Sequence, residues 1–98
     1  MPSNIPTDIF VSIRSEEQLL FQDQARSVSS ENEKGKFDIL PRHANFISLI
    51  KNFVTVIKKD GTKQDFKIDI GLMRVADDKV NVYLGVGNRS AKNTPGVK

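Results

Sequence analysis

Few side chains of this chain are suited to acid–base or nucleophilic chemistry. His43 is its single histidine and follows Pro41 in a short polar turn between two apolar runs. Nucleophilic catalysis needs a Ser, Thr or Cys held by an oriented base, but no G-x-S-x-G segment, Gly-rich phosphate loop or second histidine occurs. The chain has no cysteine, so carboxylates alone would have to complete a zinc site around His43. We therefore expect His43 to order its turn or to contact a partner protein, with no catalytic residue, metal or cofactor.

Glu31 and Glu33 are the remaining candidates for acid–base chemistry. They stand in the polar segment Ser29 to Lys34, which we expect to be a loop. An acid–base pair requires apolar surroundings that desolvate one carboxylate, and no apolar residue flanks these two. Polar loops on an ordered scaffold are common sites of binding contacts. The segment therefore indicates binding rather than catalysis.

The phenylalanines allow two interpretations, as stacking platforms for single-stranded nucleic acid or as core residues. Five of the six fall within apolar strand patterns and are expected in the core: Phe21, Phe37, Phe46, Phe53 and Phe66. Phe10 is the exception, because it falls opposite Ile9, Val11 and Ile13 on its strand. An apolar residue on the outer face of a strand indicates a second buried surface.

The charge is unevenly distributed along the 98 residues. The formal net charge is +3, but residues 88–98 hold three basic and no acidic residues, which leaves 12 of each sign in residues 1–87. A nucleic-acid-binding domain concentrates basic charge on its folded face, so this distribution disfavours that class. It indicates one domain, residues 1–87, followed by a disordered basic tail, residues 88–98. No apolar run reaches the roughly 18 residues that span a membrane, and the N-terminus lacks a signal-peptide pattern, so we expect a soluble, cytosolic protein.

The candidate residues are positioned by segments with apolar residues at alternate positions, which is typical of β-strands. The expected strands and buried segments are Ile9–Arg14, Leu19–Val28, Phe37–Ile39, Phe46–Ile50, Phe53–Ile57, Gln64–Ile70, Leu72–Val75 and Lys79–Leu84. Asp60-Gly61 predicts a hairpin with a type I′ turn, and Asp77-Asp78 predicts a second hairpin. On the returning strand we expect Phe66, Ile68 and Ile70 to point inward. Short strands at regular intervals without an amphipathic helix predict an all-β fold, an antiparallel sandwich or barrel.

The segment Gly35–Ile50 resembles the GxFGILPGHAPLI-type signature of the epsilon subunit (delta in mitochondria) of rotary F-type ATP synthases. The matching residues are Phe37, Ile39, Leu40, Pro41, His43 and Ala44. Ser15–Phe21 is similar to the family's S-x-E-x-x-x-F/L-F segment, and Gly71–Val75 to its SGGFLEV-like turn and strand. The ordered set of similarities covers about Ile9 to Leu84. Arg42 stands where the signature has a glycine, so a positive φ there would strain the backbone.

The resemblance implies a flattened antiparallel β-sandwich of about ten short strands. It implies a non-catalytic rotor-stalk subunit that couples the gamma subunit to the membrane c-ring in proton-driven ATP synthesis. Such a subunit lies peripherally on the cytoplasmic side of the energy-transducing plasma membrane. The ring-facing tip implied by position consists of Glu31, Asn32, Glu33, Lys34, Arg42 and His43. Phe10 is the implied gamma-facing residue.

Family members usually add a C-terminal pair of helices that can inhibit ATP hydrolysis and sometimes bind ATP. Only 14 residues follow Leu84 here, and Pro95 and Gly96 among them oppose a helix. We therefore expect neither autoinhibition nor nucleotide binding from this chain. Two alternatives to the rotor subunit stay open: a stand-alone β-sandwich interaction module and, less favoured by the neutral body, a small nucleic-acid-binding barrel.

Overall fold

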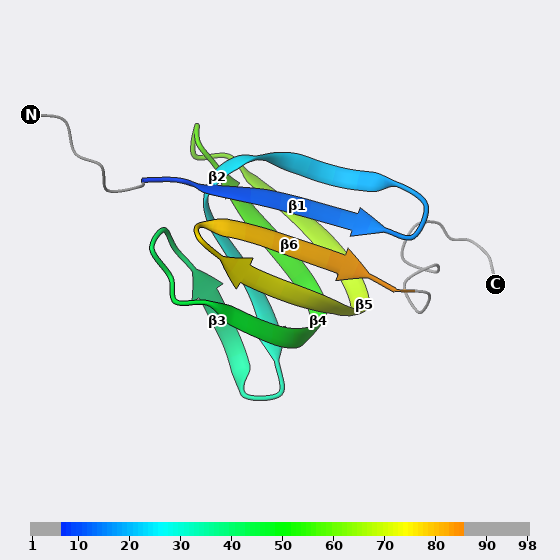
Figure 1. The fold of residues 1–98 in the computed structure, drawn as a ribbon. Helices are drawn as coiled ribbons and strands as arrows, with labels where there is room; N and C mark the ends of the chain where they lie inside the picture. Colours follow the sequence, from blue (N-terminus) through cyan, green and yellow to red (C-terminus); the bar gives the residue numbers. More distant parts are fainter. Residues whose placement is uncertain (1–6, 86–98) are drawn as a thin grey trace, which may run out of the picture.

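The computed structural model describes residues 7–85 as one antiparallel-rich sheet of six strands (Figure 1). The strands are β1 (Ile9–Ser15), β2 (Leu19–Asn32), β3 (Gly35–Ile39), β4 (Phe46–Lys58), β5 (Lys63–Ala76) and β6 (Lys79–Leu84). The described residues contain no helix, and therefore none long and apolar enough to cross a membrane. The tail expected at residues 88–98 lies outside the described part of the chain.

The sheet closes on itself like a barrel. The strand order is β1-β6-β5-β4-β2-β3, and β1 also pairs with β2, so five strands form a ring and β3 extends it beyond β2. All pairings are antiparallel except β1 with β6, which run parallel. The all-β prediction is confirmed. The expected number of about ten strands is wrong for the described residues, because β2, β4 and β5 are each 13 or 14 residues long where shorter strands were expected.

Inward-pointing residues of every strand fill the interior. The buried set consists of aliphatic side chains and one methionine: Ile9, Val11, Ile13, Ala25, Val28, Ile39, Ile50, Val54, Val56, Ile68, Met73, Val75, Val80, Val82 and Leu84. Burying each of these side chains except that of Ala25 contributes roughly 1.5–3 kcal/mol. Ser30 is also buried, and its Oγ donates a hydrogen bond of 2.7 Å to the carbonyl of Phe53, so the hydroxyl is satisfied inside the core.

Both predicted hairpins are present. Asp77 and Asp78 have φ of 52° and 62°, the double positive φ that a type I′ turn requires. The β4–β5 hairpin differs from the predicted type I′ turn, because only Gly61 of the Asp60-Gly61 pair has a positive φ, 92°. A longer connection forms instead, in which the Gly61 N–H donates to the Lys58 carbonyl at 2.9 Å.

Four local expectations were wrong. Phe53, expected in the core, is not among the phenylalanines packed against it, and the Lys36 ammonium lies 5.9 Å from its ring centroid. The polar segment Ser29 to Lys34 is not a loop, since β2 continues to Asn32 and leaves a two-residue turn. Phe46–Ile50 is not a buried segment throughout, because alternate residues point outward. Ile70 is exposed rather than inward: Lys51 pairs with Ile70 while Asn52 pairs with Ile68, so β5 holds one extra residue and its alternation shifts by one.

Candidate interaction surfaces

The β2–β3 hairpin holds four of the residues predicted to contact a partner. Glu33 and Lys34 form its turn and are exposed. Glu31 and Asn32 lie in β2 and are tied to β4, since Glu31 Oε1 accepts from Asn52 Nδ2 at 2.9 Å and Asn32 Nδ2 donates to Ser48 Oγ at 3.0 Å. Asn32 Oδ1 also accepts from the Lys34 N–H at 2.9 Å. In the described part of the chain, the side chains of Glu33 and Lys34 therefore form none of the hydrogen bonds that hold this hairpin together.

Arg42 and His43 lie in a tight turn after β3. The His43 N–H donates to the Leu40 carbonyl at 3.1 Å, Pro41 takes the second position, and Arg42 has φ 69° at the third, which is the pattern of a type II turn. The Arg42 N–H donates to a carboxylate oxygen of Asp78 at 2.5 Å. Arg42 thus has the positive φ that strains a non-glycine residue, and the hydrogen bond fixes this turn to the β5–β6 turn.

His43 contributes to the order of its own turn. Its Nδ1 lies 2.7 Å from the Ala44 carbonyl, which can only accept, so Nδ1 is the donor. Its ring packs edge-on against Phe46, with 5.7 Å between centroids. Within residues 7–85, no group of histidine and carboxylate side chains is arranged to hold a metal ion. The structural part of the expectation for His43 is confirmed.

The two predicted contact segments are not adjacent. The Glu33-Lys34 turn precedes β3 and the Arg42-His43 turn follows it, so the strand separates them by about 13 Å of backbone. In Figure 1, the β2–β3 turn lies at the bottom, and the loop after β3 lies beside the β5–β6 turn. A partner that touches both segments must run along β3.

A row of large apolar side chains crosses the outside of three neighbouring strands and ends at an arginine on a fourth. Leu49 pairs with Leu72, Leu72 with Tyr83 and Tyr83 with Arg14, from β4 through β5 and β6 to β1. Leu49 is 64% exposed, as is Ile47, two residues before it. We call the cluster of Ile47, Leu49, Ile70, Leu72 and Tyr83 the apolar face.

The apolar face is hollowed by a shallow groove. A depression of about 330 Å³ lies between Leu49, Ile70, Leu72, Tyr83 and the chain at Leu84-Gly85, with Gly71 at its floor. Single exposed apolar residues are ordinary on a monomer, but five that are neighbours across strands mark an interaction surface. Sequence reasoning missed this surface. The available signal was in Phe46–Ile50, where Ile47 and Leu49 are apolar although they alternate with the inward positions of the strand.

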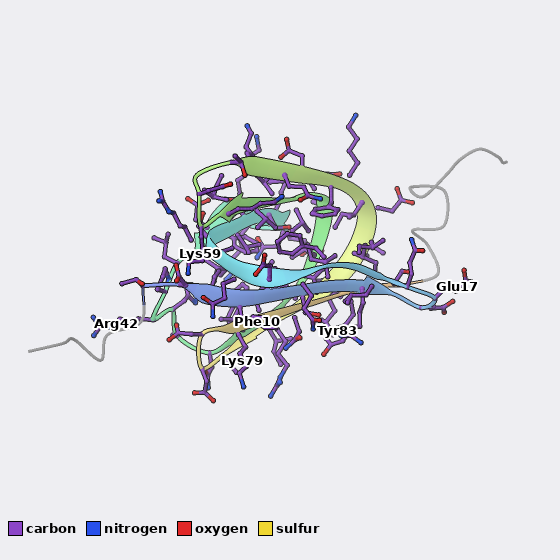
Figure 2. All side chains as sticks on the ribbon, turned by 90° about the horizontal axis from the view of Figure 1, so that it is seen from above. Phe10, Glu17, Arg42, Lys59, Lys79 and Tyr83 are labelled. Carbon is purple, nitrogen blue, oxygen red and sulfur yellow. The ribbon has the colours of Figure 1, made fainter. Side chains whose placement is uncertain are left out.

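Phe10 lies on the same side of the sheet, as its predicted outward position requires. It pairs with Lys79 and is 38% exposed. Figure 2 shows Phe10, Lys79 and Tyr83 on one side of β1 and β6, with Arg42 and Glu17 at opposite ends of the molecule. Phe10 therefore extends the apolar face toward the Arg42 turn, although the centre of that face lies on β4, β5 and β6.

The outside of β3, β2 and the adjoining parts of β4 and β5 is polar. Asp38 pairs with Ser29, Ser29 with Thr55 and Thr55 with Asp65. The hydroxyl of Ser29 donates to Asp38, and that of Thr55 donates to Asp65 at 2.5 Å. We call this row of four residues the polar face. The donors and acceptors of these two hydrogen bonds all belong to the row.

Comparison with known proteins agrees with this fold. Residues 8–85 match the family model described as the ATP synthase delta/epsilon chain, beta-sandwich domain. An ATP synthase epsilon chain of Campylobacter hominis is 36% identical over 90 residues, which cover 84% of this chain and 69% of the relative. One of a Nitratiruptor species is 36% identical over 75 residues, 76% of this chain and 58% of the relative.

Solved structures show the same fold. A chain of the Euglena gracilis mitochondrial ATP synthase superposes with a TM-score of 0.76 at 20% identity, covering 84% of this chain and 53% of that one. A chain in the central stalk and c-ring of the Tetrahymena thermophila enzyme gives 0.67 at 9% identity, covering 85% of this chain and 66% of that one. With the family match spanning residues 8–85, the chain belongs to the beta-sandwich domain family of ATP synthase delta and epsilon chains.

Proposed function

We propose that this chain is a non-catalytic rotor subunit of the central stalk of an F-type ATP synthase, where it couples the gamma subunit to the c-ring. The matched region spans about half to two thirds of the length of the curated relatives. Their printed names, ATP synthase epsilon chain, support the assignment. The observation that carries the proposal is the apolar face, because a monomer gains nothing from leaving it in water.

The apolar face is the proposed gamma-binding surface, with Phe10 at its margin. Five large apolar side chains that are close in space can supply the buried centre of a protein–protein interface. Leu49 and Ile47 protrude most, at 64% exposure each, and Leu49 lines the groove. These side chains offer a partner far more apolar area than Phe10 alone.

The c-ring contact is proposed along β3, between the two turns at its ends. The Glu33-Lys34 turn and the Arg42-His43 turn carry charges of both signs, and Lys36 and Asp38 point outward from the strand between them. Mixed charges suit a polar contact with short loops, where complementarity fixes register more than it adds affinity. In this arrangement the chain is peripheral to the membrane, on its cytoplasmic side.

Native mass spectrometry with the gamma subunit and the c-ring of the same organism tests the proposal. We expect a one-to-one complex with gamma at micromolar concentration and a ternary complex when the ring is added. Absence of any gamma complex under these conditions would overturn the rotor assignment. It would leave the second candidate, a stand-alone interaction module that uses the same apolar face for an unrelated partner.

Charge reversal at the hairpin tests the ring contact separately. Glu33→Lys, and the double change with Glu31→Lys, are expected to weaken capture of the c-ring. Glu33 has no structural bond among those described, so its reversal should leave the thermal midpoint unchanged, whereas Glu31 loses its hydrogen bond to Asn52 and costs about 1 kcal/mol. Ring capture that stays at the wild-type level in both variants would remove the hairpin from the contact.

A further inference from the structure

Positive charges predominate around the apolar face. Four cations occupy outward positions among its residues: Arg14, Lys51, Arg74 and Lys79. Arg14 ends the row of Leu49, Leu72 and Tyr83, Arg74 pairs with Ile47, Lys51 with Ile70 and Lys79 with Phe10. Ser12, Ala76 and Asn81, at other outward positions of these strand segments, are neutral. One carboxylate lies beside them: Asp69, the extra residue of the β5 bulge, is exposed next to Ile70.

These cations are not neutralised within the described chain. In residues 7–85 the salt bridge found joins Lys59 to Asp8, at 3.5 Å, and involves none of the four. Arg14 donates only to the Ser12 hydroxyl, at 3.3 Å. On the polar face, in contrast, the side chains of Asp38 and Asp65 already accept hydrogen bonds from neighbouring hydroxyls. The apolar face therefore combines exposed apolar area with an excess of positive charge, four cations against the one carboxylate of Asp69.

This combination discriminates between possible occupants. A second copy packed face to face would be isologous, so eight cations and only two Asp69 carboxylates would share one desolvated interface. Like charges placed opposite each other in an interface cost several kcal/mol. A partner with an apolar centre and carboxylates around it instead satisfies both features.

We infer that the partner of the apolar face is a protein surface whose apolar centre is bordered by Asp or Glu side chains that pair with Arg14 and Arg74. The inference rests on the proposed function in taking this partner to be the gamma subunit, and it adds the chemistry of recognition. Arginine suits such a site because its guanidinium donates two parallel hydrogen bonds to one carboxylate. The apolar centre supplies affinity, and the two arginines fix the orientation of the partner.

The test compares equal charge changes on the two sides of the sheet. Dissociation constants for gamma would be measured for the wild-type 98-residue chain, Arg74→Glu and Lys67→Glu at about 50 mM and about 500 mM salt, where screening differs strongly. Lys67 is the matched control, because it is exposed on β5 and points outward on the polar side. We expect Arg74→Glu to weaken binding at least about tenfold at low salt and much less at high salt, with Lys67→Glu within about twofold of wild type.

The possible outcomes separate the inference from the proposed function. If the wild-type chain binds gamma and the two variants weaken binding equally, the acidic border is refuted while the rotor assignment stands. If the wild-type chain binds no gamma, both fail. Vesicles containing anionic lipid form the last arm: salt-sensitive vesicle binding that is lost in Arg74→Glu, with gamma binding unchanged, would assign the face to a membrane and overturn the inference.

Discussion

The polar face and the apolar face have the same strand arrangement but differ in how their side chains are satisfied. Each contains a row of four residues that crosses four strands, and each includes parts of β4 and β5. In the polar row, the hydroxyls of Ser29 and Thr55 donate to the neighbouring aspartates, so these polar groups find hydrogen-bond partners inside the chain. In the apolar row, leucine and tyrosine side chains are exposed beside Arg14, which forms no salt bridge within residues 7–85. The difference supports the proposal that the apolar face is buried against a partner, because only that face leaves large apolar side chains exposed.

The same two strands serve both faces because their pairing changes register between them. Asn52 has φ 74°, and at this point β5 contains one residue more than β4. A bulge of this kind bends a strand pair and increases its twist. It also shifts the alternation of β5, which places Ile70 and Leu72 outside and Gly71 and Met73 inside. The bulge is therefore what creates the β5 part of the apolar face.

The largest expected effect on stability is the difference between alanine substitutions at Met73 and Leu72, two neighbouring residues of β5. Met73 is fully buried, so Met73→Ala should cost about 2–4 kcal/mol through lost burial and a residual cavity. Leu72→Ala removes a side chain from the outer surface and should cost under about 1 kcal/mol. Urea denaturation of both variants measures the difference. Equal costs would mean that Leu72 is covered in the isolated chain and that the apolar face does not exist as described.

The bulge between the faces gives the next effect. Asn52→Val places a β-branched residue at positive φ and should cost about 1–2 kcal/mol. Asn52→Gly is the control, because it also loses the hydrogen bond to Glu31 but tolerates the backbone conformation. Denaturation midpoints should therefore fall clearly more for the valine variant. If both fall equally, the hydrogen bond rather than the backbone holds this position.

The turn at Arg42 should respond in the opposite direction. Arg42→Gly relieves the strain of φ 69° and should stabilise the chain by about 0.5–1 kcal/mol, after the greater flexibility of unfolded glycine is included. Arg42→Ala keeps the strained conformation and should bring no gain. Thermal unfolding distinguishes the two. A glycine variant no more stable than the alanine variant would show that the bond from the Arg42 N–H to Asp78 offsets the strain fully.

The smallest effect concerns the β4–β5 turn. The backbone N–H and hydroxyl of Thr62 donate to Asp60 and lower the pKa of its carboxyl. A lowered folded-state pKa stabilises the fold above the ordinary value of about 3.9 and loses this contribution as pH falls through the folded-state value. Asp60→Asn should therefore reduce the acid sensitivity of unfolding below about pH 4, measured by acid titration. Glu33→Gln, in the exposed β2–β3 turn, is the control, and an equal reduction there would contradict the assignment.

Local sequence patterns predicted much of the fold and little of the apolar face. The alternation of apolar residues located most strands, and the Asp-Gly and Asp-Asp pairs located two hairpins. Phe10 was placed outside because it alternates with the inward residues of its strand. The parallel pairing of β1 with β6 joins residues about 70 positions apart, and no local signal reports it. Ile47 and Leu49 stand in a run of apolar residues, and the sequence of such a run does not show which of its side chains are buried and which are exposed. The bulge that exposes Ile70 depends on strand register, which appears only when the sheet is assembled.

Thiol labelling tests most directly whether the apolar face binds gamma. The chain has no cysteine, so Leu49→Cys and Lys67→Cys each carry a single thiol, one on the apolar face and one on the polar side. Both positions are exposed, and both thiols should react rapidly with a soluble maleimide in the isolated chain. With saturating gamma subunit, we predict that labelling at position 49 slows at least about tenfold while labelling at position 67 is unchanged. Unchanged labelling at position 49 in a chain shown to bind gamma, or protection at position 67 instead, would contradict the account.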